Sequence, residues 1–278
     1  SPKSAYFTRG PAGPKMVLSP RDHFPGKVVF PMTQEERLHF LLQALLAERP
    51  GGQDIAIPRR PEDRRRLLRA LMNTRPPDPI PLEVLAVQDA FLQAELAEKN
   101  ITRLADLTPR QPGRYLWQGD ITTLAVGAIV NAANSGMLGC FVPCHGCIDN
   151  AIHTFAGVQL RLACARIMDE QGRQEETGGA KLTPAFNLPC RYILHTVGPI
   201  VSGRLTQRDC DLLASCYRSC LELAEENHIK SVAFCCISTG EFHFPNRQAA
   251  EIAVNTVMEF KEKTPSNMEV IFNVFKDM

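Results

Sequence analysis

At 278 residues and 30.9 kDa, the chain is long enough for one large domain or two smaller ones, which excludes a mini-protein held together only by disulfides. Its 44% hydrophobic and 22% charged residues are ordinary for a globular protein and exclude wholesale disorder, a collagen-like chain and a coiled-coil rod. Because 31 basic and 30 acidic residues leave a net charge of +1, and no apolar run reaches the roughly 20 residues that cross a bilayer, we expect neither a nucleic-acid nor a membrane partner.

The first segment, residues 1–32, is rich in proline and glycine, and its few charges are mostly basic. It lacks the apolar core of a secretory signal, and Asp22 and the prolines interrupt the amphipathic helix of a transit peptide. We therefore expect an irregular N-terminal arm over residues 1–32.

The next stretch begins with a clear helix start. Thr33 and Glu36 have the spacing of a capping box, and leucines recur after them at helical spacing, which predicts a helix over residues 33–48. Residues 61–72 and 82–100 predict two further helices.

Together these helices predict a small all-helical domain over residues 33–108, followed by a linker over residues 108–113. The second helix carries four arginines: Arg64, Arg65, Arg66 and Arg69. Such arginines either form a solvated face or bind a partner, and we expect the solvated face.

Beyond the linker, short β-rich runs alternate with amphipathic runs. The candidate strands are residues 115–118, 128–131, 180–183, 192–197, 231–236 and 270–275. The candidate helices are residues 147–155, 158–169, 209–226 and 246–261. This alternation predicts an α/β fold over residues 112–278, a three-layer α/β/α sandwich with a mixed or largely parallel sheet. Ligands bind such sheets at the carboxyl ends of the strands, so functional residues are expected directly after them.

All ten cysteines lie between Cys140 and Cys236, whereas a disulfide framework would staple a whole small chain. This confinement favours a reducing, intracellular compartment, with the cytoplasm as the first choice. Three of these cysteines differ from the rest, because they flank His145 in a loop-like stretch: Cys140, Cys144 and Cys147. The others are expected to be small buried hydrophobic side chains: Cys164, Cys190, Cys210, Cys216, Cys220, Cys235 and Cys236.

Three predicted strand exits carry residue types suited to ligand binding. The first presents Asp120 and the amide of Ile121, although an aspartate there is also a common turn or cap residue. The second presents Asn131 and Asn134 among small residues, so two side-chain amides offer donors and acceptors. The third, residues 238–245, is a glycine-containing loop that feeds a helix, and such loops present backbone N–H groups to a diphosphate.

Several motifs, in order along the chain, resemble those of a known family. They are residues 117–122 (WQGDIT), 128–134 (AIVNAAN), 148–153 (IDNAIH), 188–189 (LP), 193–199 (ILHTVGP) and the loop over residues 238–245. Over residues 112–278 the chain resembles the macrodomain, a module that binds ADP-ribose. The resemblance implies ADP-ribose and ADP-ribosylated protein as partners.

One stretch departs from the common macrodomain pattern. Where many macrodomains carry a run of glycines, this chain has residues 139–147 (GCFVPCHGC), which resembles the zinc-containing subgroup of ADP-ribosyl hydrolases that carry a helical extension. Positions Cys140, His145 and Cys147 match the ligands of that subgroup. Two thiolates and one imidazole leave the fourth tetrahedral position of Zn²⁺ open. If Cys144 also coordinates, the zinc is structural instead; a thiol-rich loop without a metal is the remaining alternative.

Two thiolates cancel the charge of the ion, so a bound water is less acidic than on a tris-histidine zinc. We therefore expect one Zn²⁺ to orient the distal ribose and to activate either its hydroxyl or a water. Asn134 is expected to hydrogen-bond that ribose, and Asp149 to steer or deprotonate the nucleophile. An aspartate at a helix start is equally a favourable partner for the helix dipole.

The resemblance also assigns the rest of the pocket. Asp120 is expected to accept from the adenine amino group while the Ile121 amide meets the ring edge. Residues Ser238, Thr239, Gly240, Glu241 and Phe242 are expected to wrap the diphosphate, and Phe244 to stack near the adenine or its ribose. We expect His153 and His195 to be satisfied core histidines, and His243 is a minor candidate.

The sequence thus predicts a zinc-dependent hydrolase that removes mono-ADP-ribose from modified protein side chains. Three alternatives stand beside it. They are a non-catalytic module that recognises ADP-ribosylated protein, a deacetylase of O-acetyl-ADP-ribose, and an assembly protein with a structural zinc.

Overall fold

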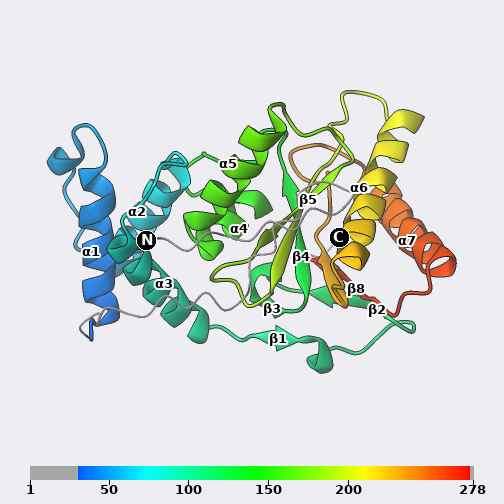
Figure 1. Cartoon of the computed structure of the whole chain (residues 1–278), viewed down its shortest axis with the longest axis horizontal. Helices are drawn as coiled ribbons and strands as arrows, with labels where there is room; N and C mark the ends of the chain where they lie inside the picture. Colours follow the sequence, from blue (N-terminus) through cyan, green and yellow to red (C-terminus); the bar gives the residue numbers. More distant parts are fainter. Residues whose placement is uncertain (1–30, 276–278) are drawn as a thin grey trace, which may run out of the picture. The chain divides into compact units, whose positions relative to one another are not determined.

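The computed structural model describes residues 31–275 (Figure 1). The arm predicted over residues 1–32 lies almost wholly outside the described residues. None of the helices between residues 31 and 275 has both the length and the apolarity to span a membrane.

Three α-helices come first: α1 (Gln34–Ala47), α2 (Pro61–Thr74) and α3 (Leu82–Ala97). The predicted capping box is present, because the Thr33 hydroxyl accepts from the Glu36 N–H and the Glu36 carboxylate accepts from the Thr33 N–H. Buried leucines of α1 pack against Leu68 and Leu71 of α2 and Phe91 of α3, so the three helices share one apolar core.

The arginines of α2 do not form one uniformly solvated face. Arg64 pairs with Glu35 at 3.0 Å and Arg65 with Glu95 at 3.1 Å, both within the helical region. Arg69 instead contacts residues of the α/β region.

Six strands form the main sheet: β2 (Arg114–Gln118), β4 (Ala128–Ala133), β5 (Ala180–Pro184), β6 (Tyr192–Val197), β7 (Ser231–Phe234) and β8 (Glu269–Val274). Their order is β2-β8-β7-β4-β6-β5, and all neighbours are parallel except β5 and β6. The sheet is therefore mixed, as predicted. The carboxyl ends of the parallel strands lie at one edge, with β4 and β7 adjacent near the centre.

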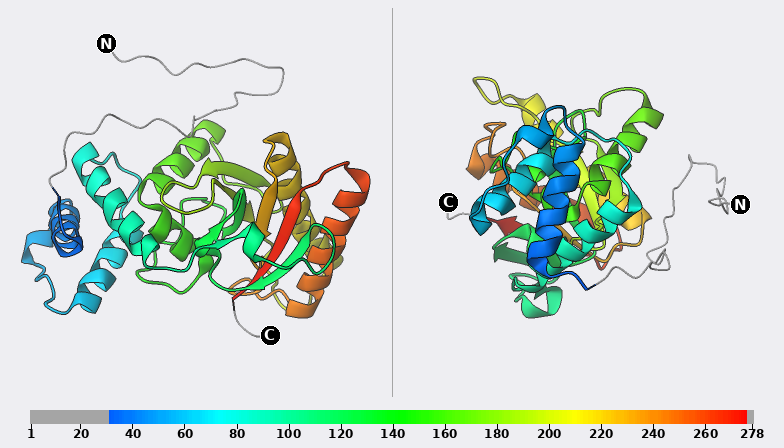
Figure 2. Two further views of the ribbon diagram at one scale, coloured as in Figure 1. Left: turned by 90° about the horizontal axis from the view of Figure 1, so that it is seen from below. Right: turned by 90° about the vertical axis from the view of Figure 1, so that its left-hand side faces the viewer.

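Helices cover both faces of this sheet: α4 (Ile148–Ala156), α5 (Gln159–Gln171), α6 (Gln207–Glu226) and α7 (Asn246–Lys263). Figures 1 and 2 show α4 and α5 on one face and α6 and α7 on the other, which confirms the three-layer α/β/α arrangement. The core is formed by the apolar strand residues and the buried faces of these helices.

Two short strands and three short 3₁₀ helices were not predicted. β1 (Thr102–Arg103) pairs in parallel with β3 (Leu124–Ala125), and the 3₁₀ helices are η1 (Gly52–Asp54), η2 (Leu104–Asp106) and η3 (Ile121–Thr123). Two residues are too few to show strand periodicity. The helical and α/β regions belong to one compact unit that starts at Met32, and the division near residues 108–112 stays a prediction.

Candidate functional site

The site lies where the loops after β4 and β7 meet the start of α4. Residues 134–147 connect β4 to α4, and the second part of this connection, residues 138–147, is here called the metal loop. Cys147 is the N-cap of α4, and its Sγ accepts from the Asn150 N–H at 3.4 Å. A sulfur acceptor at this position satisfies one of the free N–H groups of the first turn, so the loop enters the helix with a fixed geometry.

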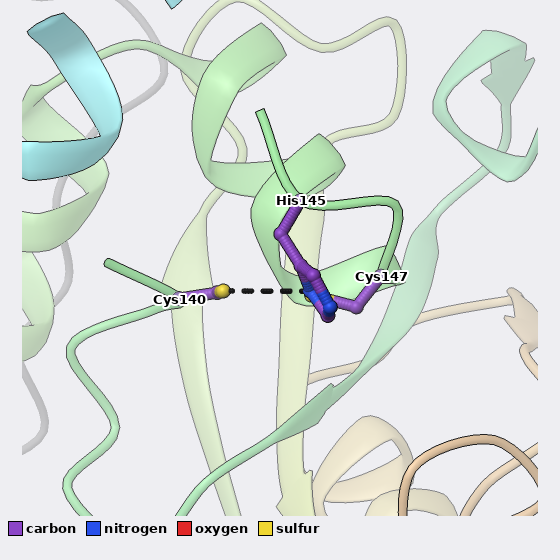
Figure 3. A group of neighbouring side chains, drawn as sticks. All are labelled: Cys140, His145 and Cys147. Atoms are coloured by element: carbon purple, nitrogen blue, oxygen red, sulfur yellow. Dashed lines mark hydrogen bonds between the residues drawn. The ribbon is translucent and has the colours of Figure 1, made fainter. Parts of the chain in front are cut away.

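The metal loop brings Cys140, His145 and Cys147 together, as the sequence predicted (Figure 3). One ligand atom from each lies within 4.8 Å of the other two, and all three residues are half-buried. The Sγ of Cys140 lies 3.7 Å from Nδ1 of His145. Tetrahedral Zn²⁺ places a sulfur and a nitrogen ligand about 3.6 Å apart, so the donor set and its spacing fit a zinc ion.

Burial, more than any other cause, raises the pKa of Cys147 to about 11, and the neighbouring Cys140 thiol acts in the same direction. Both cysteines must be thiolates to hold a metal, so binding of an ion here would require the Cys147 thiol to lose its proton. On the far side of the imidazole, Nε2 of His145 lies 3.5 Å from Oε1 of Glu241 in the loop before α7. The loop between β7 and α7 therefore contacts a metal-ligand candidate directly.

Cys144 points away from this group. It has a positive φ of 54°, its N–H donates to Oδ1 of Asn73 at 2.9 Å, and its thiol donates to the carbonyl of Arg66 at 3.4 Å. Both partners lie in α2. The structure thus groups three soft ligands, with Cys144 outside the group.

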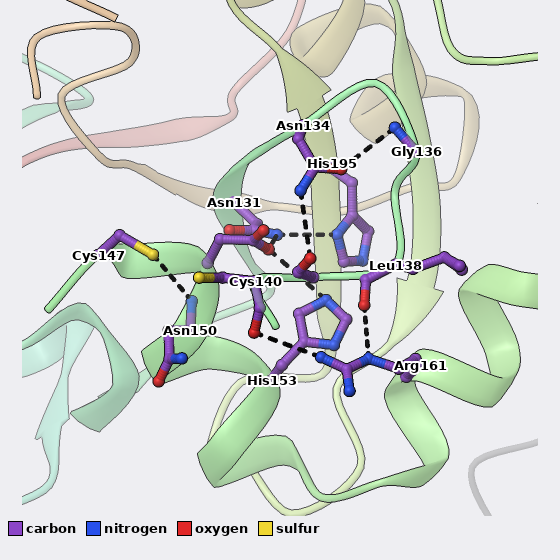
Figure 4. Close-up of polar contacts among 12 residues, drawn as sticks. Asn131, Asn134, Gly136, Leu138, Cys140, Cys147, Asn150, His153, Arg161 and His195 are labelled. Carbon is purple, nitrogen blue, oxygen red and sulfur yellow. Dashed lines mark hydrogen bonds and ion pairs between the residues drawn. The ribbon is translucent and has the colours of Figure 1, made fainter. Parts of the chain in front are cut away.

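Behind the metal loop lies a buried polar network that includes Asn131, His153 and His195 (Figure 4). The Asn131 amide donates to Oδ1 of Asp149 at 2.8 Å and lies 3.2 Å from Nδ1 of His195, whose Nε2 lies 2.9 Å from the Thr183 hydroxyl. Asn131 is fully buried, so its side chain holds Asp149 from behind. Burial raises the pKa of Asp149 to about 6, against the hydrogen bond from Asn131 and the charge of Arg161.

The two core histidines differ. His195 is buried with both ring nitrogens in hydrogen-bond range of partners, as expected. His153 is also buried, but neither ring nitrogen has a hydrogen bond among the described residues, and Nε2 lies 3.6 Å from Oδ1 of Asp149. The expectation that His153 is satisfied is wrong, because its position beside Asp149 and Gly139 leaves it no aligned partner in the described part of the chain.

Asn134 lies exposed at the exit of β4. Its Oδ1 accepts from the Gly136 N–H at 3.1 Å, and its Nδ2 donates to the Gly139 carbonyl at 3.2 Å, so it shapes the turn that leads to Cys140. Gly139 has a φ of +85°, and a Cβ there would lie 2.8 Å from the His153 ring. The start of the metal loop thus requires glycine.

At the first strand exit, Asp120 caps η3. Its Oδ1 accepts from both the N–H and the hydroxyl of Thr122, at 2.9 and 2.6 Å. The side chain of Ile121 is buried beneath it. The capping role expected as an alternative is therefore present, and the bonds to Thr122 use only one carboxylate oxygen.

The loop from Ser238 to Phe244 is closed by the Phe244 N–H donating to the Ser238 carbonyl at 2.8 Å. Thr239 and Phe242 are half-buried, and Gly240 and Glu241 are exposed. Ser238 is buried with a positive φ of 63°, and its hydroxyl has no hydrogen-bond partner among the described residues.

The ring of Phe244 belongs to the core and is 2% exposed, so it anchors the loop. His243 is exposed and also has a positive φ, of 58°. Among the cysteines expected to be buried, Cys210 is half-buried and Cys236 is exposed, since β7 ends before Cys236.

Four residues surround the metal loop that the sequence did not connect with it: Arg69, Asn73, Asn150 and Arg161. Arg161 carried a usable signal, because a charged residue on the apolar face of a predicted helix needs buried partners. Arg69 and Asn73 lie far from the loop in sequence, and Asn150 lies close to the predicted ligand Cys147, so spacing gave no separate signal for these three.

The comparisons with known proteins point to one family. A family model described as "Macro domain" matches residues 130–253. The Protein-ADP-ribose hydrolase of Treponema medium is 60% identical over 251 residues, which cover 88% of this chain and 96% of that protein. The protein of the same name from Staphylococcus aureus (strain MSSA476) is 49% identical over 247 residues, 88% of this chain and 92% of that protein.

Among solved structures, the Trypanosoma brucei macrodomain in complex with ADP-ribose superposes with a TM-score of 0.58. It is 30% identical, and the match covers 75% of this chain and 90% of that one. The motif resemblance is confirmed by these matches, and the chain belongs to the macrodomain family.

Proposed function

We propose that this protein is a hydrolase that releases ADP-ribose from modified protein side chains. Relatives with 49% and 60% identity along nearly their whole length are named Protein-ADP-ribose hydrolase. The observation that carries the proposal is the gathering of Cys140, His145 and Cys147 directly before Asp149. A metal-ligand set and a buried carboxylate at one strand exit are suited to bond cleavage as well as to ligand binding.

In this proposal, Cys140, His145 and Cys147 hold one Zn²⁺. The soft donors, a sulfur–nitrogen spacing close to the value of about 3.6 Å for tetrahedral zinc, and the outward position of Cys144 support it. When bound, the ion supplies a positive charge that orients and polarises a substrate oxygen. All ten cysteines have free thiols, which also supports a reducing compartment such as the cytoplasm.

Asn134 and Asp149 act on the distal ribose. The amide of Asn134 keeps one hydrogen on Nδ2 and one lone pair on Oδ1 beyond its two loop bonds, and these bind ribose hydroxyls. Asp149 is held by Asn131 in a water-poor setting, where a carboxylate is a stronger proton acceptor than in water. Asp149 therefore takes the proton of the attacking hydroxyl or water.

The rest of the pocket binds the nucleotide. The buried Ser238 hydroxyl and the backbone N–H groups of the loop before α7 face the diphosphate, because a buried hydroxyl without a partner is unfavourable unless a ligand supplies one. Asp120 binds the adenine amino group through the carboxylate oxygen that does not bond Thr122.

The test uses a protein substrate carrying radiolabelled mono-ADP-ribose, made with serine, acidic and arginine linkages. Wild type releases ADP-ribose from at least one substrate, whereas Cys147→Ser and Asp149→Asn lose at least about 100-fold in rate. Calorimetry with free ADP-ribose shows that both variants keep its binding. Release at the wild-type rate by both variants contradicts the proposal. So does a wild-type protein that binds ADP-ribose tightly but releases it from no substrate, a result that identifies a binding module. Faster turnover of O-acetyl-ADP-ribose than of every protein substrate identifies the deacetylase.

A further inference from the structure

The metal loop is held from outside by helix α2. Asn73, in the last turn of α2, is 2% exposed, and its Oδ1 accepts from the Cys144 N–H at 2.9 Å. Its Nδ2 donates to the Thr154 hydroxyl of α4 at 2.9 Å. One side chain from the helical region therefore joins the middle of the metal loop to the helix that follows it.

Arg69, one turn earlier on α2, holds the next part of the loop. Its guanidinium donates to Oδ1 of Asn150 at 2.9 and 3.2 Å and to the carbonyl of His145 at 3.4 Å. Asn150 in turn donates through Nδ2 to the Val142 carbonyl at 2.9 Å. Arg69 thus contacts the backbone of His145 and also holds the Asn150 side chain, which in turn binds the loop at Val142.

Arg161 of α5 connects the end of α2 to the start of the loop. It is 5% exposed and donates to the carbonyls of Asn73 at 2.8 Å and Arg75 at 2.6 Å. The last carbonyls of a helix have no partner within the helix, so the guanidinium satisfies groups that α2 leaves open. The same guanidinium donates to the carbonyls of Leu138 at 2.6 Å and Cys140 at 3.4 Å.

These contacts surround the loop at Cys140, Cys144 and His145 while leaving the ligand atoms themselves untouched. Groups that fix the orientation of metal ligands change metal affinity by about 10- to 100-fold when they are removed. We propose that α2 is part of the metal site, with Arg69 and Asn73 as positioning residues that hold the metal loop in its ligand geometry. This inference rests on the proposed function, because it requires that the loop binds a metal.

The experiment measures metal directly. Full-length wild type, Arg69→Ala, Asn73→Ala and the control Arg66→Ala are loaded with Zn²⁺, and its transfer to a chromogenic chelator is followed. Arg66 is the matched control, because it lies on the same helix and its side chain is exposed. Arg69→Ala and Asn73→Ala transfer zinc about 10- to 100-fold faster than wild type, and Arg66→Ala transfers it at the wild-type rate.

Free ADP-ribose binding and the thermal midpoint of the zinc-free proteins are measured alongside. Because Asn73 is buried, its variant is used only if ADP-ribose binding is retained, whereas half-buried Arg69 provides the independent variant. Zinc transfer at the wild-type rate in Arg69→Ala overturns the inference and leaves the proposed function intact. Wild type that takes up no zinc overturns both.

Discussion

Nε2 of His145 lies 3.5 Å from Oε1 of Glu241, so the loop before α7 reaches across to a metal-ligand candidate. Nδ1 of the same ring faces Cys140. An imidazole that binds a metal through one nitrogen commonly donates its other N–H to a carboxylate, which fixes the ring orientation. We therefore expect Glu241 to support His145 as a metal ligand, in addition to its place in the loop predicted to wrap the diphosphate.

We expect Glu241→Gln to weaken zinc binding by about 10-fold, at the low end of such effects, because the Glu241 side chain is 74% exposed and its charge is screened by water. Competition with a chelator of known affinity measures this. The control is Glu251→Gln on α7. Among the described residues, the Glu251 carboxylate pairs only with exposed Arg247. Equal zinc affinity in Glu241→Gln and wild type would show that the contact is incidental.

Cys144→Ser is expected to keep one zinc per chain with unchanged affinity. The thiol of Cys144 donates to the carbonyl of Arg66, and a serine hydroxyl makes the same bond. Cys140→Ser is the comparison and loses zinc binding, since a hydroxyl replaces a thiolate ligand. Metal analysis after gel filtration counts the ions, and loss of zinc from Cys144→Ser would mean that the fourth ligand is a protein atom.

Gly139→Ala is expected to lower the free energy of unfolding by about 2 kcal/mol or more. The residue has a φ of +85°, and the new Cβ would lie 2.8 Å from the His153 ring. Gly172→Ala isolates the backbone contribution, because Gly172 also has a positive φ but nothing within 4 Å of a new Cβ. Urea unfolding of the two variants gives both values, and an equal loss in each would show that the His153 ring moves aside freely.

His195 makes a contribution to stability that depends on pH. Burial lowers its pKa to about 3 from an ordinary value of 6.5, so below pH 6.5 the unfolded chain binds a proton that the native protein does not. Between pH 7 and pH 5 this costs about 2 kcal/mol of stability. Buried His153, whose pKa is also lowered, likewise reduces stability as the pH falls. Asp149 has the opposite effect below pH 6, because its pKa is raised to about 6 and the native protein binds the proton first.

The comparison of wild type with His195→Gln separates these contributions. In zinc-free protein, the difference in unfolding free energy between wild type and variant is expected to shrink by about 2 kcal/mol from pH 7 to pH 5. Urea unfolding at both pH values measures it. A difference that stays constant would mean that His195 titrates normally in the native protein.

Local patterns predicted the elements and most of the metal loop. The capping box of Thr33 and Glu36 and the cluster of Cys140, His145 and Cys147 depend on residues close together in sequence, so short-range spacing was sufficient. The strand exits were found because the carboxyl ends of parallel strands share one edge.

The packing around these residues could not be predicted from the sequence. Asn131 and Phe244 lie at predicted ligand positions, yet tertiary packing buries the side chains of both. Asn73 contacts Cys144 across 71 positions of sequence, and Arg161 contacts the end of α2 across a similar interval. No local periodicity encodes such contacts, because they depend on how α2 packs against α4 and α5.

Zinc dependence is tested most directly by a zinc titration of metal-stripped protein, with bound zinc and release of ADP-ribose from modified protein measured in the same samples. We predict that release is absent without metal and rises in proportion to zinc occupancy until one ion per chain is bound. Full release from the stripped protein, with no increase on addition of zinc, would show that the activity does not depend on the metal.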